Sequence, residues 1–364
     1  MRSSVYSKRM SVAPFDHPLL SRLLSEPAAA DVFSAGMELA GMLSFERALA
    51  EAEEDEGLLP QGAAASIAQA LDSFVPDAAA LAAATRRDGL PTVELIRQLR
   101  AHAGAALAAH LHLGATSQDM IDTSLTLRLA RLVTLLEAQL AAVLAHLTRL
   151  GQRDGATPLI ARTRMQRAIP IRVADKLVAW ARPLLRQRER LAALKPRLLV
   201  VQFGGAAGTL DQLGAKGPAV RARLAARLGL GDPGDAWHSG RDNFIEFAGW
   251  LAATSGLLGK IGADITLMAQ NEIAEITLSE GGGSSVMPHK ANPVAAEILV
   301  TLARFTAALS GGMTQALVHE NERSGAAWTL EWMLLPQIAV AAAASLARAD
   351  ELLAGASFNP AKAP

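Results

Sequence analysis

The sequence predicts an all-α protein built on long helices, and three observations support this prediction. Alanine and leucine are abundant, whereas β-branched residues form few alternating runs. Apolar side chains recur at the spacing of one helix face along several long stretches. Helices of this length, which we call rods, cannot bury all of their apolar faces within one slender monomer. We therefore expect a long central helical bundle that continues across subunits.

The expected helices follow in chain order. Residues 34–54 carry apolar side chains near helical spacing, with Ser34 as the N-cap. Short helices should fill residues 60–110. An apolar stripe then runs through residues 119–151, enough for a helix of roughly 50 Å at about 1.5 Å per residue. Four more long helical segments are expected, at residues 171–199 (bent by Pro183), 241–276, 294–317 and 328–354.

A chain of 364 residues can bury a large core and is long enough for two or three domains. We expect an N-terminal helical domain at residues 1–110. The central bundle should follow at residues 111–320 and include a polar loop at residues 281–293. Residues 321–364 should form a reduced C-terminal helical region.

The composition narrows the classes of function. The formal net charge is zero, so nothing favours nucleic acid or an anionic membrane as a partner. The absence of cysteine excludes disulfides, thiolate nucleophiles and cysteine-based metal sites. The first twenty residues lack the apolar core of a signal peptide, and charges interrupt the most apolar stretches before about 18 residues. We expect a soluble, cytoplasmic protein.

Three polar segments interrupt the apolar pattern, and the first is "HLHLGATSQDMIDT", residues 110–123. Gly114 allows a tight turn, and Thr116, Ser117 and Asp119 can cap the helix that follows. The free N–H groups at such a helix start attract anions. An ordinary, well-capped helix explains the same residues.

The second segment, "ARTRMQRAIPIR" at residues 161–172, places four arginines ahead of an apolar rod. The planar guanidinium group suits carboxylates, although a solvated, charged helix end would have the same composition. The third segment is the loop "GGGSSVMPHKANP", residues 281–293. Asn292 is interpreted as an N-cap and Pro293 as the first helical residue, which places Lys290 beside a helix start. The alternative is a flexible linker with an ordinary cap.

No metal or cofactor is expected. His110 and His112 are two residues apart, so their side chains diverge on a helix, and no carboxylate cluster accompanies them. The glycine-rich "QFGGAAGTL" lacks the strand and helix context of a dinucleotide-binding motif.

The three segments together resemble the signature regions of the fumarase/aspartase superfamily. The loop at residues 281–293 is similar to the pattern G-S-S-x-M-P-x-K-x-N-P, and the resemblance runs from about residue 15 to residue 354. It implies a fumarase/aspartase-like helical fold and a homotetramer whose active sites combine segments of different subunits at the subunit interfaces.

Within the superfamily, the chain most resembles the bacterial cycloisomerases that lactonise 3-carboxy-cis,cis-muconate. "GATSQD", "MPHK" and "ENERSGAAWTLEW" carry this resemblance. The implied partner is a small tricarboxylate substrate. Three alternatives stay open: an adenylosuccinate-lyase-like enzyme that releases fumarate, a cycloisomerase for a sulfonated muconate analogue, and a non-catalytic scaffold.

The chain departs from the superfamily pattern at three positions. Arg164 stands where lyases usually carry a histidine that serves the leaving group, and Arg167 stands where some cycloisomerases have one. Asn321 replaces the histidine of an E-H-E-R pattern. Lactonisation needs no such acid because its nucleophile is a carboxylate of the substrate itself. The two arginines, Arg164 and Arg167, suit a carboxylate clamp.

The resemblance implies a set of functional residues, which we state here as expectations. The catalytic residues would be Ser284, Lys290, Asn292 and His112. The substrate-binding residues would be Thr116, Ser117, Gln118, Arg164, Arg167, Ser285, Met287 and Arg323. Ser284 would transfer a proton at carbon, and Lys290 and Asn292 would stabilise the negative charge that develops.

Overall fold

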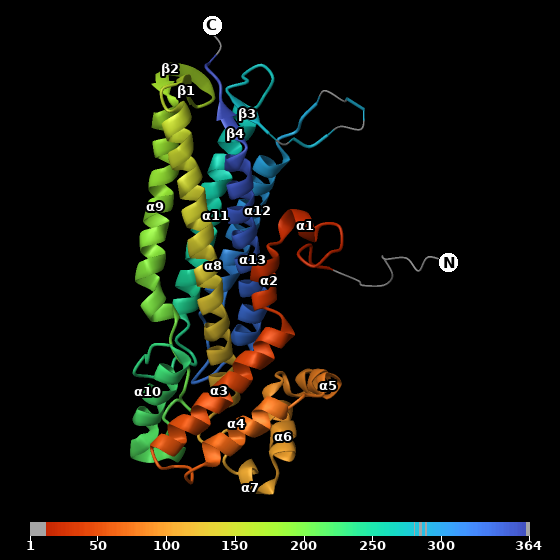
Figure 1. Cartoon of the computed structure of the whole chain (residues 1–364), viewed down its shortest axis with the longest axis vertical. Helices are drawn as coiled ribbons and strands as arrows, with labels where there is room; N and C mark the ends of the chain where they lie inside the picture. The colour runs from red at the N-terminus through yellow and green to blue at the C-terminus, as the bar shows by residue number, and fades with distance from the viewer. Residues whose placement is uncertain (1–11, 280, 284–285, 288–289, 362–364) are drawn as a thin grey trace, which may run out of the picture.

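The computed structural model describes residues 12–279, 281–283, 286–287 and 290–361. These residues are mainly helical, which confirms the all-α fold class. Figure 1 shows long helices side by side in an elongated bundle, with most of the shorter helices at its lower end.

The N-terminal part contains short helices around one longer helix. Ser34 caps that helix, α3, by accepting the N–H of Met37, as predicted. Short helices fill the stretch up to residue 110, also as predicted. The bounds are α1 (Ser21–Leu24), α2 (Pro27–Val32), α3 (Ala35–Asp55), α4 (Ala63–Ser73), α5 (Ala78–Asp88), α6 (Thr92–Ala103) and α7 (Ala105–Ala108).

The five predicted rods are all present. They are α8 (Ser117–Asp154), α9 (Val173–Leu198), α11 (Asp242–Met268), α12 (Val294–Gln315) and α13 (Ala326–Ala354). The short 3-10 helix η1 (Asp211–Lys216) and α10 (Gly217–Leu228) lie between α9 and α11 in the chain.

Two antiparallel strand pairs depart from the helical prediction. β1 (Pro158–Thr163) pairs with β2 (Gln166–Arg172), where sequence reasoning considered a charged helix end. The rod expected over residues 241–276 ends at Met268 instead. Residue 276, the last residue of that predicted helix, instead begins β3 (Ile276–Leu278). This strand pairs with β4 (Ala356–Phe358) at the upper end of the bundle.

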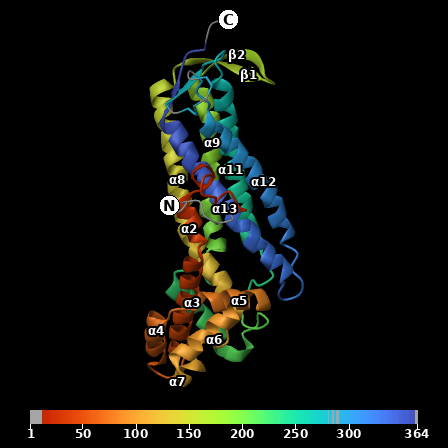
Figure 2. The same ribbon diagram turned by 90° about the vertical axis from the view of Figure 1, so that its right-hand side faces the viewer.

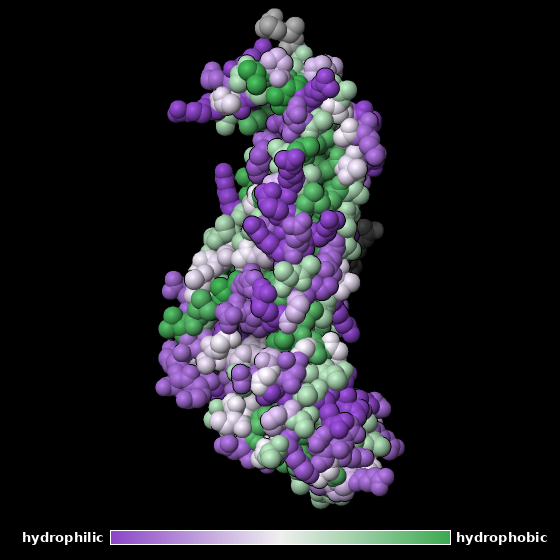
Figure 3. All heavy atoms as spheres, turned by 90° about the vertical axis from the view of Figure 1, so that its left-hand side faces the viewer, coloured by the Kyte–Doolittle hydropathy of each residue, from purple (hydrophilic) through white to green (hydrophobic). Residues whose placement is uncertain are grey.

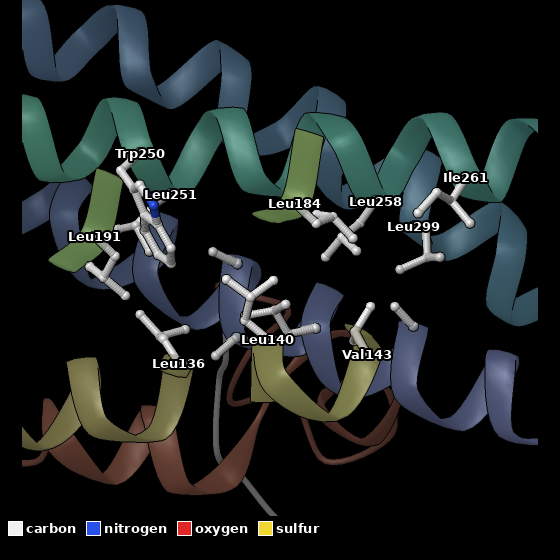
Figure 4. Packing of buried hydrophobic residues seen from close by; sticks show 14 of the residues in the cluster. Leu136, Leu140, Val143, Leu184, Leu191, Trp250, Leu251, Leu258, Ile261 and Leu299 are labelled. Atoms are coloured by element: carbon white, nitrogen blue, oxygen red, sulfur yellow. The ribbon is translucent and has the colours of Figure 1, made fainter. Parts of the chain in front are cut away.

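The main core lies between the rods. Figure 4 shows leucines and other apolar side chains of α8, α9, α11 and α12 converging on one another. The helices α11 and α12 approach closely because Gly262 has no side chain. A Cβ at this position would lie 2.4 Å from the carbonyl oxygen of Ala296.

A second core occupies the lower end, where α3, α4 and α6 pack on the start of α8. Phe45, Leu95, Leu99 and Met120 are fully buried there. This core fixes the position of the first turn of α8, which carries the first polar segment.

The exposed faces of the rods are partly apolar. Figure 3 shows green hydrophobic patches between purple hydrophilic ones along one side of the bundle. By length and composition, α12 and α13 could each cross a membrane. A core helix of a soluble protein passes the same test, and 61% of the apolar window of α13 is buried inside the fold.

Candidate active site

The first polar segment lines a cavity of about 930 Å³ at the lower end of the bundle. Thr116, Ser117 and Gln118, at the start of α8, form part of its wall, and Arg323 approaches from the segment before α13. Arg323 donates a hydrogen bond from Nη1 to Oγ1 of Thr116 at 2.6 Å. The structure thus brings together four of the predicted substrate-binding residues.

Two tryptophans of α13 form an aromatic part of the same cavity. Trp328 and Trp332 stand edge to face, with ring centroids 4.7 Å apart. The cavity therefore offers both hydrogen-bond donors for carboxylates and flat apolar surface for a conjugated substrate.

Asp119 holds the first turn of α8 in place. Its carboxylate accepts the N–H of Thr116 at 2.9 Å, which is the capping bond that the sequence suggested. It also accepts the N–H groups of Gly204 and Gly205 at 3.0 and 2.9 Å and lies 2.7 Å from Nε2 of His238. Gly205 has φ of 69°, and a Cβ there would lie 2.7 Å from the carbonyl oxygen of residue 114. The "QFGGAAGTL" segment thus packs against the site.

A buried charge network lies next to the cavity wall. Arg241, on the segment before α11, donates hydrogen bonds to Asp122 and Glu331, and all three side chains are at most 1% exposed. Burial alone would lower the pKa of Arg241, but the two carboxylates raise it, so the guanidinium stays charged. Asp122 in turn accepts hydrogen bonds from Gln118 and Trp328, which line the cavity. The network therefore fixes two wall residues.

His112 lies in the turn just before α8. Nδ1 of its ring is 2.5 Å from Oε1 of Glu46, which is buried in α3. The backbone of His112 has φ of 63°, a left-handed conformation that is uncommon for residues other than glycine. His112 is thus held firmly, four residues before Thr116.

The two arginines of the second segment lie on the β1–β2 hairpin. Thr163 pairs with Gln166, so Arg164 and Met165 form a two-residue turn, with φ of 50° and 68°. Arg164 and Arg167 are exposed. Figure 2 shows the hairpin projecting beyond the bundle.

A third arginine of this segment has a structural role. Arg162 forms two hydrogen bonds, at 2.7 and 3.0 Å, with the carboxylate of Glu275, which is 2% exposed. This ion pair ties the hairpin to the segment that precedes the polar loop.

The polar loop also lies at the upper end (Figure 1). Gly282 and Asn292 exchange backbone hydrogen bonds at 2.8 and 2.9 Å, which closes the base of the loop. The prediction that Asn292 caps the helix is wrong: α12 begins at Val294, and Pro293 occupies the N-cap position. The backbone N–H and carbonyl of Asn292 instead pair with Gly282 across the loop base.

The remaining loop residues are only partly described. Lys290 is exposed, and its N–H donates to the carbonyl of Met287 at 3.0 Å. Met287 is 42% exposed. The predicted residues Ser284 and Ser285 lie outside the described residues.

The predicted residues thus form two groups at opposite ends of one chain. The cavity group lies at the start of α8, and the hairpin follows the end of the same helix. Thirty-eight residues of α8 separate the two ends, which is roughly 57 Å of helix. One chain by itself does not bring Arg164, Arg167 or Lys290 to the cavity.

The titrating groups of the site include no cluster suited to a metal ion. Within residues 12–279, 281–283, 286–287 and 290–361, no group of three or more His, Cys, Asp or Glu side chains could hold one.

Sequence reasoning missed the support of the site. Arg241, Glu331 and His238 have no role in the sequence prediction, although each contacts a residue near the cavity. Asp119 and Asp122 carried a signal that could have been used: two acids one turn apart in an otherwise apolar helix pattern. Such acids need buried partners, and the "HSGRDN" segment supplies two of them.

Comparison with known proteins places these features in context. The Lyase family model matches residues 25–305. The 3-carboxy-cis,cis-muconate cycloisomerase of Pseudomonas aeruginosa PAO1 is 41% identical over 352 residues, which cover 95% of this chain and 76% of that protein. The enzyme of the same name from Bradyrhizobium diazoefficiens is 39% identical, over 95% and 78% of the two chains. The crystal structure of the 3-carboxy-cis,cis-muconate lactonizing enzyme from Pseudomonas putida superposes with a TM-score of 0.87. It shares 38% identity and covers 94% of this chain and 77% of that one.

Proposed function

Because the chain belongs to the Lyase family, within the fumarase/aspartase superfamily, we propose that it is an intramolecular lyase that lactonises 3-carboxy-cis,cis-muconate. The observation that carries this proposal is the similarity to cycloisomerases over about the whole chain, at 36–41% identity. The product would be the 4-carboxymuconolactone, and the reaction would belong to the breakdown of protocatechuate through β-ketoadipate.

The cavity suits a planar tricarboxylate. Arg323 and the polar side chains of Thr116, Ser117 and Gln118 can bind carboxylates. Trp328 and Trp332 give the diene a flat apolar surface. Arg164 and Arg167 add positive charge if the hairpin of another subunit reaches this cavity.

The proposed reaction begins when one substrate carboxylate adds to the conjugated alkene. A carbon–oxygen bond forms, and the electron pair of the alkene moves toward the neighbouring carboxylate as an enediolate. Lys290 and Asn292 would stabilise this charge. Ser284 would then deliver a proton to the adjacent carbon, with His112 orienting the substrate. The trianion becomes a dianion, so each turnover takes up one proton from solution.

The substitution of arginine for histidine agrees with this chemistry. An amine leaving group must be protonated, whereas the nucleophile here is already an ionised carboxylate. Ring closure needs orientation more than acid catalysis, because the nucleophile and the alkene belong to one molecule. Arg164 can therefore bind a carboxylate at a position where a lyase needs an acid.

We also propose that the active sites form at the interfaces of a homotetramer in the cytoplasm. The separation of the two residue groups along α8 supports a shared site, since no single chain unites them. The apolar window of α12 is only 22% buried within the chain, which leaves a face for another subunit.

Subunit mixing tests the shared site. Arg323→Gln removes a cavity residue, and Lys290→Gln removes a loop residue. At a substrate concentration far below the raised KM of Arg323→Gln, each variant alone should show little activity. Mixed tetramers prepared by joint unfolding and refolding should regain part of the activity, because some sites combine an intact cavity with an intact loop. If mixing restores nothing while wild-type controls refold fully, both groups act within one chain.

Product analysis tests the reaction itself. Proton NMR after incubation with 3-carboxy-cis,cis-muconate should show the lactone and no fumarate. When the protein is incubated with adenylosuccinate, the adenylosuccinate should remain unchanged. A sulfonated muconate should react more slowly than the carboxylate, and a faster reaction would assign the enzyme to that analogue instead.

A further inference from the structure

The carboxyl group of Glu46 gives both of its oxygens to His112. Oε1 lies 2.5 Å from Nδ1 of the ring, and Oε2 accepts the backbone N–H of His112 at 3.0 Å. Glu46 lies in α3, 66 residues earlier in the chain, and its side chain is 1% exposed. The side chain of His112 is 12% exposed. With its backbone and one ring nitrogen bound to the same carboxyl, the ring has little freedom to rotate.

The backbone at His112 needs such support. A left-handed conformation is sterically unfavourable for a residue with a Cβ, and it persists only where the surroundings hold it. The bond from the His112 N–H to Glu46 is one such support. The segment leads within four residues to Thr116, in the wall of the cavity. Glu46 therefore fixes both the path of this turn and the ring that it carries.

A second carboxyl on the same helix provides an internal comparison. Glu53 lies seven residues after Glu46, two turns on and therefore near the same face of α3. It is also fully buried, yet neither of its oxygens has a hydrogen-bond partner among the described residues. The fold thus buries a carboxyl here without a partner. Burial by itself does not explain why Glu46 contacts His112 twice.

We propose that Glu46 is a positioning residue of the active site, which holds the ring of His112 so that Nε2 meets the bound substrate. This inference rests on the proposed function, in which His112 orients the substrate. The carboxyl group of Glu46 holds Nδ1, so Nε2, the other ring nitrogen, is turned away from Glu46 and fixed in direction. Nε2 can then meet a carboxylate of the bound substrate in a fixed direction.

A double-mutant cycle tests this role. The variants are Glu46→Gln, His112→Asn and the double substitution, each assayed with 3-carboxy-cis,cis-muconate after circular dichroism confirms folding. Glu46→Gln should lower kcat by about 10- to 100-fold and change KM little, as for residues that orient a functional histidine. In the His112→Asn background it should cause no further loss. Glu53→Gln, the matched control, should leave kcat and KM unchanged.

Two kinetic results would overturn the inference: an unchanged kcat for Glu46→Gln, or an equal loss of kcat with and without His112. Should Glu46→Gln not fold, Glu46→Asp draws the carboxyl back from the ring and should show the same dependence on His112. Crystal structures of the wild type and the Glu46→Gln variant, both without substrate, show the orientation of the His112 ring directly. A ring that keeps its orientation in Glu46→Gln contradicts the inference. If the wild type does not convert the substrate, the proposed function fails, and these crystal structures still decide whether Glu46 positions the ring.

Discussion

Replacing Glu53 by glutamine should make the protein more stable at neutral pH. Glu53 is buried in α3 without a hydrogen-bond partner in the described part of the chain. Burial, and then the neighbouring Glu46, raise its pKa from 4.5 to about 9. The folded protein therefore keeps a proton on Glu53 that the unfolded chain releases.

The size of the effect follows from this difference in pKa. A raised pKa gives stability that is complete below pH 4.5 and is lost as the pH rises towards 9. Each pH unit in this window lowers the free energy of unfolding by about 1.4 kcal/mol. At pH 7 the loss is about 3 kcal/mol relative to pH 4.5. Glutamine has a similar shape and does not titrate, so Glu53→Gln should avoid this loss.

Urea unfolding at pH 4.5, 6, 7 and 8 measures the effect at a fixed protein concentration. The free energy of unfolding of the variant should equal that of the wild type at pH 4.5 and exceed it by about 3 kcal/mol at pH 7. Glu189→Gln, at an exposed position of α9, is the control and should show no such divergence. Parallel stability curves for the wild type and Glu53→Gln would refute the reasoning that Glu53 is protonated in the folded state.

Three further predictions concern the site. Asp119→Asn should lower the free energy of unfolding by about 3 kcal/mol or more in urea, because it turns an amide toward buried N–H donors that the carboxylate now satisfies. An unchanged midpoint would contradict this. Arg323→Gln should raise KM by about 10- to 100-fold in steady-state kinetics, since one charged hydrogen bond to a carboxylate is lost, and an unaffected KM would remove Arg323 from the cavity's function. Arg164→His should weaken substrate binding, and a rise in kcat would disprove the carboxylate-clamp role.

The long helices could be predicted because their periodicity extends over many turns. The stripe in residues 119–151 and the cap at Ser34 both appear as expected. The hairpin at residues 158–172 could not be predicted, because its turn residues are Arg164 and Met165. Neither is the asparagine or glycine that usually signals a two-residue turn. Tertiary contacts such as the Arg162–Glu275 ion pair help to hold this hairpin in place.

The candidate site, too, could be predicted only in part from the sequence. Thr116, Ser117, Gln118 and Arg323 were expected together and meet in one cavity. Their supports come from distant segments: Glu46 is 66 residues from His112. No local pattern marks such a pairing, so the contact between them emerges only from the packing of α3 against the turn before α8.

The most direct test of the central claim follows the ultraviolet absorbance of 3-carboxy-cis,cis-muconate in a weakly buffered solution with a pH indicator. The account predicts that purified protein removes the conjugated-diene absorbance, takes up one proton per substrate and releases no fumarate. Persistent diene absorbance, together with fumarate release from adenylosuccinate, would show that a lyase works here without the usual histidine. The lactonisation mechanism would then be wrong.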